Sequence, residues 1–322
     1  MAVKQQRQKM RRPCIDPGDG VLQGLAILSA LGLLLLVFLI GLQIWRAAGP
    51  SLTRFGWSFI FSRTWDPVAG VFGALPYIYG TLITTLLGLI LAAPLSLGAA
   101  IFLAELAPRP LRTVLGFLVD MLAAIPSIVY GLWGNFVLAP WLLRFLEPWL
   151  GQHFGWLPLF QGPMYGTGIL AAAIILAIMI SPLVTAISRE VLALVPTGQR
   201  EALQALGATP WEVVRVAVLP SARTGIIGAF TLGLGKALGE TMAVTLVIGN
   251  RPEISWSLFA PAHTMTSVII NEFAEAITSL HVAALIHIAL LLFLVTLLVN
   301  ILARLLIYRM ERGGKDGMMH EL

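Results

Sequence analysis

The stretch that decides the fold reads SREVLALVPTGQREALQALGATPWEVVRVAVLPSAR and covers residues 188–223. A first short helix can begin just after Pro196, and Gly207 can end it with a left-handed cap. Thr209 is a candidate N-cap for a second helix, because Pro210 suits the first helical position. The stretch therefore predicts two short helices joined by a turn.

The second of these helices carries an apolar stripe. Trp211, Val214 and Val218 are spaced i, i+3 and i+7, which places them on one helical face. A surface helix with such a stripe and flanking charges can fit a groove on a partner protein. The same stripe can instead pack on the chain's own membrane domain, and the pattern alone leaves both interpretations open.

The chain on either side of this loop is unusually apolar. Of its 322 residues, 58% are hydrophobic and 11% are charged, whereas soluble domains carry about 25% charged residues. The apolar residues gather in blocks of the ~20 residues that cross a bilayer. We therefore expect an all-α integral membrane protein with six spans, at 21–45 and at about 74–104, 114–138, 166–187, 225–249 and 281–307.

Two segments need separate interpretation. The block 21–45 is longer than the core of a cleaved signal peptide, so we expect a first helix that stays in the protein. Segment 135–165 places Trp141, Trp149 and Trp156 among several prolines. Since tryptophans favour the headgroup level, we predict an external loop with a short helix on the membrane surface.

The distribution of cations sets the orientation. If the N-terminus is cytoplasmic, 15 of the 21 Lys and Arg residues fall in cytoplasmic segments and five in external ones. This positive-inside bias predicts that both termini are cytoplasmic. The expected organisation is an N-terminal tail over 1–20, one membrane domain over 21–308 with the cytoplasmic loop 188–223, and a C-terminal tail over 309–322. The formal charge of +5 then reflects the cytoplasmic Lys and Arg residues that set the topology, and we expect no nucleic-acid partner.

The loop also resembles a known family. Glu201-Ala202, Gly207 and Leu219-Pro220 match, in residue type and spacing, the EAA loop of ATP-binding-cassette import permeases, although Leu203 and Ala217 depart from its usual residues. In that family the loop is a coupling helix that docks into a cleft of the cytoplasmic ATPase. The resemblance implies the type I importer permease fold, with ATPase coupling through Glu201, Ala202, Gly207, Trp211, Leu219 and Pro220.

Further segments resemble the PstC family of phosphate permease subunits. They are 72–85, 125–134, 235–250 and 297–304, and the resemblance covers about residues 65–308. It implies a multi-pass subunit of a phosphate importer in the bacterial inner membrane. The implied partners are a PstA-like permease in a heterodimer, a PstB-like ATPase dimer that uses ATP and Mg²⁺, and a periplasmic phosphate-binding protein.

Two charges inside the fifth block are candidates for the substrate path. Lys236 and Glu240 are four residues apart, so one continuous helix would place them on the same face. Charges within a membrane are costly and usually face the bundle interior or a wet cavity. The related permeases carry Arg and Glu at these places, and both are implicated in phosphate passage. Thr241 and Thr245 could add hydroxyl donors; alternatively, the charged pair is structural and ties this span to the partner.

The same block contains a close-packing motif. Gly235 and Gly239 form a Gly-x-x-x-Gly pair, which lets two helices approach closely. We expect this pair to lie against the homologous permease subunit.

The sequence predicts no catalysis and no bound metal or cofactor in this chain. A P-loop ends in Gly-Lys-Ser/Thr, whereas Ala237 follows Gly235-Lys236 and no Gly-Lys pair of the chain is followed by Ser or Thr, so a separate ATPase must hydrolyse ATP. The single cysteine, Cys14, makes no disulfide within the chain, and the five histidines lack metal-ligand spacing. The open alternatives are a permease for molybdate or sulfate and an ion-coupled secondary transporter in which Glu240 binds the ion.

Overall fold

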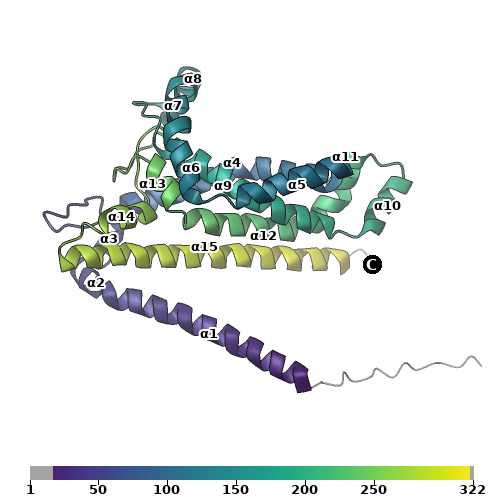
Figure 1. Cartoon of the computed structure of the whole chain (residues 1–322), viewed down its shortest axis with the longest axis horizontal. Helices are drawn as coiled ribbons and strands as arrows, with labels where there is room; N and C mark the ends of the chain where they lie inside the picture. Colours follow the sequence, from purple (N-terminus) through teal and green to yellow (C-terminus); the bar gives the residue numbers. More distant parts are fainter. Residues whose placement is uncertain (1–16, 320–322) are drawn as a thin grey trace, which may run out of the picture.

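The computed structural model describes residues 17–319, and within them the side chains of residues 21–305, 307 and 308. Every regular element of this part is a helix, and its only β-structure is two isolated bridges. The all-α prediction is therefore confirmed (Figure 1). Of the two predicted tails, residues 1–16 and 320–322 lie outside the described residues.

Six helical segments are long and apolar enough to cross a membrane. They are Val21–Ala47, Leu75–Leu106, Ser127–Phe154, Ile169–Ala193, Pro210–Leu238 and Ser279–Leu305. The first lies in α1 (Pro17–Ala47), the second comprises α4 (Leu75–Ile101) and a π-helical turn, the fourth is α9 (Ile169–Ala193), and the last lies in α15 (Ser279–Met319). The number of predicted spans is confirmed, and the boundaries of four of them shift by a few residues.

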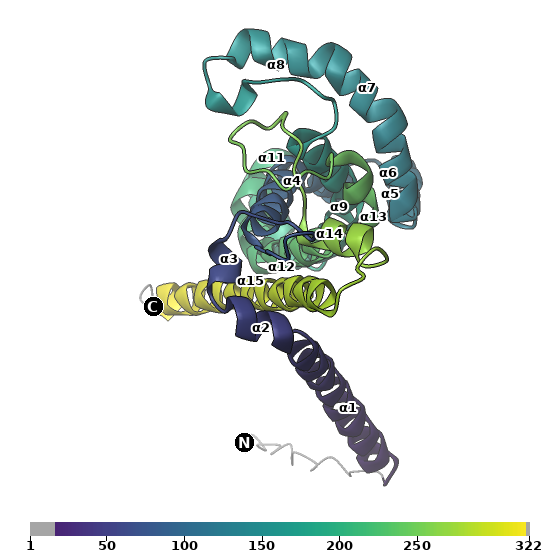
Figure 2. The same cartoon turned by 90° about the vertical axis from the view of Figure 1, so that its left-hand side faces the viewer.

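Helix α9 forms the centre of the bundle. Ile175 and Ile180 on this helix are fully buried and Leu176 nearly so, in one cluster with side chains of α4 and of the segments that follow α12 (Leu219–Leu238). Viewed along the bundle, α4 and α12 lie beside α9 (Figure 2). An apolar helix covered on most sides is the expected centre of a membrane bundle, because its neighbours shield it from lipid.

The third predicted span, 114–138, is not one helix. Helix α5 (Arg109–Ala123) ends before Pro126, and α6 (Ser127–Trp133) begins after it. The residue before a proline is pushed out of the helical region, so the chain breaks at this point.

Beyond the break the chain stays helical, through α7 (Ala139–Trp141) and α8 (Glu147–Phe154). This segment runs across the direction of α9 and α12 rather than alongside them (Figures 1 and 2). The helix predicted within 135–165 is therefore longer than expected and continues directly from α6, and by length and composition it belongs to the candidate span Ser127–Phe154 rather than to a short surface helix.

The fifth predicted span, 225–249, is wrong at both ends. One continuous helix runs from Pro210 to Leu238, comprising α11 (Pro210–Val213), a π-helical turn and α12. The second short helix of the predicted loop is thus the first turns of this span. After Leu238 the chain breaks, and α13 (Met242–Val247) and α14 (Met265–Glu272) follow as separate short helices.

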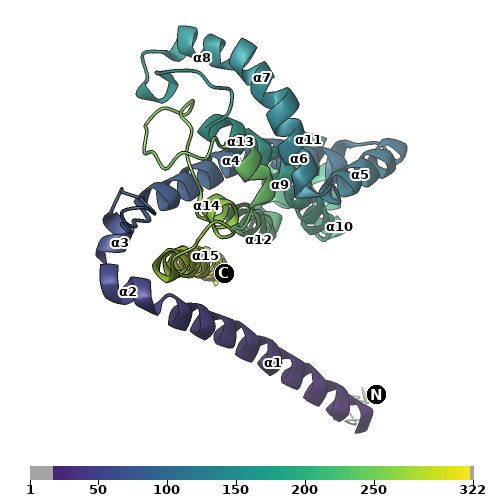
Figure 3. The ribbon, with the colours of Figure 1, turned by 60° about the vertical axis from the view of Figure 1, so that its left-hand side comes forward.

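Helix α1 stands apart from the bundle. The end of α1 that leads into α2 (Gly49–Phe55) and α3 (Ser58–Phe61) contacts α15, and its N-terminal end diverges from α15 (Figure 3). Its closest approach to α15 includes Gly41, where an added Cβ would lie 3.5 Å from the Phe293 ring. The first described turn of α1 and the last of α15 lie on the same side as α10 (Thr197–Ala205) (Figure 1), which agrees with the prediction that both termini share one side with the loop.

Close packing of α4 on α9 depends on a glycine. A Cβ added at Gly88 would lie 2.9 Å from the Leu176 Cβ and 3.2 Å from the Ala173 carbonyl oxygen. We expect Gly88→Val to lower the thermal unfolding temperature of the chain in detergent, since overpacking costs about 1–3 kcal/mol. Gly98→Val on the same helix is the matched control, because no atom lies within 4 Å of its added Cβ. Equal unfolding temperatures for the two variants would contradict this account.

Candidate functional site: translocation path and coupling loop

The candidate substrate path is centred on a helix break. Helix α12 ends at Leu238, and α13 begins at Met242. Between them, the Glu240 carboxylate accepts a hydrogen bond from the Ala243 amide at 3.2 Å. Glu240 thus satisfies one of the amides that the start of a helix leaves without a partner.

Hydroxyl groups satisfy the carbonyls that the break releases. The Thr266 hydroxyl of α14 donates to the Glu240 carbonyl at 2.8 Å, and the Thr241 hydroxyl donates to the Gly239 carbonyl at 3.2 Å. The Thr245 hydroxyl donates to the Thr241 carbonyl at 2.7 Å. Each hydroxyl has one proton to donate. In this conformation the protons of Thr241 and Thr245 are therefore engaged by the backbone rather than free to bind an anion.

A groove opens beside the break. Its volume is about 530 Å³. Thr241 and Thr266 supply its hydroxyl groups, and the other lining residues are Gly239, Ile269, Ile270, Phe273, Ala274 and Leu292. The groove joins the break to α14 and α15, and of the residues predicted for the path Thr241 lines it, whereas Lys236, Glu240 and Thr245 do not.

Lys236 lies in the last turn of α12 and is exposed in the isolated chain. Among the described side chains, no ion pair joins it to Glu240 or to any other carboxylate. The predicted placement of Lys236 and Glu240 on consecutive turns of one helix is wrong, because the helix ends at Leu238, between the two residues. The structure nevertheless keeps both residues at the same break.

The glycines of α12 divide between two faces. A Cβ added at Gly225 would clash with Val191 at 2.4 Å, and one at Gly233 would clash with Val184 at 2.7 Å, so these two residues pack on α9. Gly235 is different, because the nearest atom to its added Cβ is the Asn300 side-chain oxygen at 3.9 Å. At Gly239 only the backbone of its own helix comes within 4 Å. Gly235 therefore faces α15 at ordinary contact distance, whereas no second helix of the described chain comes within 4 Å of the Cβ added at Gly239.

The coupling loop has the turn chemistry that the sequence predicts. Helix α10 ends before Gly207, whose φ of 85° lies in the left-handed region. Thr209 caps the next helix, accepting from the Glu212 amide at 3.3 Å, while its own amide donates to the Glu212 carboxylate at 2.7 Å. This reciprocal pair is a capping box with Pro210 in the first turn.

One part of the apolar stripe packs on the chain's own membrane domain, and the other part is free to contact a partner. Val214 and Val218 are buried in a cluster with α4 and α9 side chains, so this part of the stripe packs on the chain itself. Trp211 is 54% exposed and Leu206 is 84% exposed, and both project from the loop. The remaining predicted coupling residues are exposed or half-buried, namely Glu201, Ala202, Gly207, Leu219 and Pro220.

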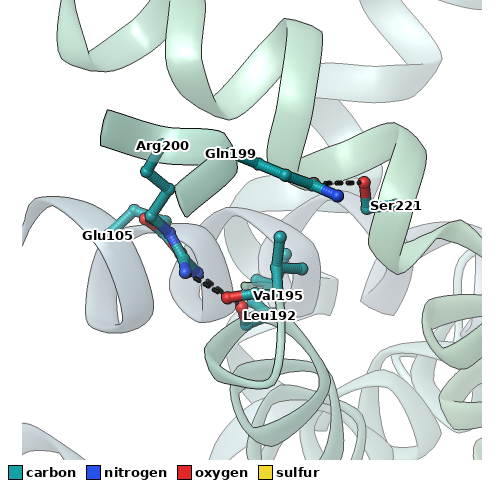
Figure 4. Close-up of polar contacts among 6 residues, drawn as sticks. All are labelled: Glu105, Leu192, Val195, Gln199, Arg200 and Ser221. Atoms are coloured by element: carbon teal, nitrogen blue, oxygen red, sulfur yellow. Dashed lines mark hydrogen bonds and ion pairs between the residues drawn. The ribbon is translucent and has the colours of Figure 1, made fainter. Parts of the chain in front are cut away.

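Arg200 fastens α10 to the bundle (Figure 4). Its guanidinium donates to both carboxylate oxygens of Glu105, at 3.2 and 2.8 Å. The same group donates to the Leu192 carbonyl at 2.8 Å and to the Val195 carbonyl. Glu105 belongs to the π-helical turn that ends the second span, and Leu192 to the end of α9.

Sequence analysis missed four residues of these sites. Thr266 and Glu105 reach their partners from 26 and 95 residues away, so no local pattern reveals them. Arg200 directly precedes the Glu-Ala pair of the loop, and Leu206 directly precedes Gly207. An apolar residue beside a predicted left-handed cap was a usable signal for Leu206, because such a cap faces solvent.

Comparison with known proteins places the chain in a family. Residues 96–312 match the family described as "Binding-protein-dependent transport system inner membrane component". The chain is 48% identical over 292 residues to "Phosphate transport system permease protein PstC" of Mesorhizobium japonicum, covering 89% of each chain. A "Probable phosphate transport system permease protein PstC" of Methanocaldococcus jannaschii is 37% identical over 285 residues, which are 87% of this chain and 89% of that protein.

Solved structures with the same fold are permease chains of transporters. A chain of a bacterial alginate ABC transporter, solved with an alginate-bound periplasmic protein, has a TM-score of 0.59 at 14% identity, covering 88% of this chain and 93% of that one. A chain of the MetNI methionine ABC transporter has a TM-score of 0.55 at 19% identity, covering 77% and 99%. The fold is that of ABC importer permeases, and the chain belongs to the binding-protein-dependent transport system inner membrane component family, within its PstC group.

Proposed function

We propose that this chain is a permease subunit of an ATP-driven phosphate importer and forms half of the path through the membrane. The observation that carries the proposal is a cation, Lys236, that pairs with no carboxylate among the described side chains and lies beside a carboxylate-capped helix break within a multi-pass membrane bundle. A cation in a membrane domain without an ion-pair partner is costly unless it meets water or an anionic ligand. The relatives at 37–48% identity are named as phosphate transport permeases, so we take phosphate as the anion.

The chain needs partners for this function. No Gly-Lys pair of the chain is followed by Ser or Thr, and Gly235-Lys236 lies at the end of a membrane helix rather than in a strand-to-helix loop, which leaves ATP and Mg²⁺ to a PstB-like ATPase dimer. We assign the exposed surface formed by α10, the turn after it and the start of α11, with Glu201, Leu206 and Trp211, to the docking of that ATPase. A periplasmic phosphate-binding protein would deliver the anion to the opposite side of the bacterial inner membrane, and both termini would be cytoplasmic.

The open face of α12 fits a second permease. At the end of this helix Lys236 and Gly239 are exposed in the described chain, and the nearest atom to the Cβ added at Gly235 is the Asn300 side-chain oxygen of α15, at 3.9 Å. A homologous PstA-like subunit on this face would complete the path around Lys236 and allow close helix contact at the glycines. Import would then follow from alternating access, as ATP-driven closure of the ATPases moves the coupling loops.

The test of this assignment is uptake of labelled phosphate by proteoliposomes that contain this chain with its partner permease, ATPase and binding protein. We expect uptake to require ATP and to resist an excess of sulfate or molybdate. If an excess of sulfate or molybdate suppresses the uptake of labelled phosphate, the suppressing anion rather than phosphate is the substrate. Uptake that follows an imposed ion gradient without the ATPase would instead identify a secondary transporter.

Lys236 is the residue to vary first. We expect Lys236→Ala to lower phosphate uptake by about tenfold or more, because a hydrogen bond to a charged group contributes about 1.5–3 kcal/mol. Lys236→Arg keeps the positive charge and should retain most of the uptake. Wild-type uptake by an assembled Lys236→Ala complex would exclude the transport role.

Glu240→Gln is the matched variant for the carboxylate. Its amide oxygen can still accept from the Ala243 amide, so the start of α13 is kept while the negative charge is lost. We expect normal assembly with altered uptake if the charge itself acts in transport. Normal uptake would restrict Glu240 to its role as a helix cap.

Gly235 tests the permease interface. We expect Gly235→Leu to reduce recovery of the heterodimer by about tenfold while lowering the unfolding temperature of the isolated chain less than Gly233→Leu does, since bulk added to a close interface costs about 1–3 kcal/mol. Gly233→Leu, two residues away, should lower the unfolding temperature of the isolated chain because its Cβ would meet Val184 at 2.7 Å. Undiminished heterodimer recovery by Gly235→Leu would place the partner on another face.

A further inference from the structure

We propose that Arg200 and Glu105 form the link through which movement of the coupling helix reaches the membrane spans. The inference rests on the proposed function, because it concerns how ATP hydrolysis by a partner drives passage through this chain. Arg200 is a positioning residue in this role, since it touches neither substrate nor ATP.

The first observation is how many segments this one side chain joins. Arg200 lies on α10, and its guanidinium contacts Glu105 at the end of the second span together with the Leu192 and Val195 carbonyls at the end of α9 (Figure 4). Every guanidinium nitrogen has a partner in this set, namely Nε, Nη1 and Nη2. The two-pronged contact with Glu105 fixes direction as well as distance, because both groups are planar.

The second observation is how little else holds α10. No residue of α10 is buried. Leu203 packs partly against the cluster formed by the ends of α4, α9 and the following helix, and the Ser221 hydroxyl donates to Gln199 at 3.0 Å. A helix without a buried apolar face moves relative to its neighbours at low cost, so its stiffest attachment decides which neighbours move with it.

The third observation is the shielding of the pair. The Arg200 and Glu105 side chains are 17% and 11% exposed, whereas the other arginine ion pair among the described side chains, Arg189 with Asp120, is 3.5 Å long and half open to solvent at Asp120. Shielded charges interact more strongly and are less screened by salt than exposed ones. The Arg200–Glu105 contact is thus suited to transmit force, and it connects α10 to both helices that pack at the centre of the bundle.

The experiment measures phosphate taken up and ATP hydrolysed in the same reconstituted complex. We expect Arg200→Gln to lower the ratio of phosphate moved to ATP hydrolysed by about threefold to thirtyfold, the range for substitutions along a coupling network. Glu105→Gln should lower the ratio less, because the contacts of Arg200 with the two carbonyls survive. Arg200→Lys should be intermediate, since an ammonium cannot meet Glu105 and both carbonyls in the same fork geometry.

Arg112→Gln is the matched control. It removes one positive charge from an exposed position of α5 on the same side of the membrane, and we expect a wild-type ratio. A wild-type ratio in Arg200→Gln would overturn the proposal. It would equally be overturned if uptake and hydrolysis fell in parallel, or if all three variants of the pair failed to assemble with the ATPase, because the pair would then serve folding alone.

The outcome is separable from that of the proposed function. If the wild-type complex moves a different anion, the assignment of phosphate fails, and the ratio is measured with that anion instead. If the wild-type complex transports phosphate, and substitutions at Arg200 and Glu105 leave the ratio of phosphate moved to ATP hydrolysed unchanged, the proposed function stands and the link is excluded.

Discussion

Lipid offers no hydrogen-bond partner to the peptide backbone, and this constraint governs every irregularity of the structure. A continuous helix satisfies its own amides and carbonyls, so each break must find other partners within the protein. At the break before Pro126, the Tyr130 hydroxyl donates to the Leu122 carbonyl at 2.8 Å. At the break after Leu238, Thr241 and Thr266 donate to released carbonyls, and Glu240 accepts from an amide. At both breaks, polar side chains therefore supply the partners that a continuous helix would have provided.

The coupling loop is held in a different way from the spans. The spans pack by apolar contact and by glycines such as Gly88 and Gly233, whereas α10 is attached through one arginine and its acceptors. Apolar packing is insensitive to small rotations, but a two-pronged ion pair depends on direction. A directional contact transmits the movement of an element better than apolar packing, which tolerates small rotations. The ion pair of Arg200 attaches α10 by such a directional contact.

Much of the fold could be predicted because two signals are local. Apolar blocks of membrane length identify spans without any knowledge of their packing, and the left-handed cap at Gly207 and the N-cap at Thr209 follow from the chemistry of single residues. The break after Leu238 could not be predicted in the same way. Gly239 and Glu240 interrupt an apolar run by only two residues, and a helix tolerates both.

The candidate site was only partly predictable for a related reason. Lys236 and Glu240 were identified because charges are rare in spans, but their geometry was inferred from a helix that does not continue. The Thr266 and Glu105 contacts join residues 26 and 95 positions apart, so they exist only once the helices have packed. Sequence patterns identify residue types that are out of place in lipid, whereas the partners that stabilise them are set by tertiary structure.

The distribution of satisfied and unsatisfied groups on α12 argues that the described chain is one part of a larger path. On the side facing α9, glycines and small residues are in close contact, with added Cβ atoms clashing at 2.4 and 2.7 Å. On the other side, the Cβ atoms added at Gly235 and Gly239 meet no atom closer than 3.7 Å, and Lys236 has no counter-charge among the described residues. A membrane protein gains nothing from close-packing glycines that face lipid, and it loses free energy from an unpaired cation there. Both features become favourable when a second subunit and an aqueous path for an anion lie against this face, so the same surface accounts for the glycines and for the charge.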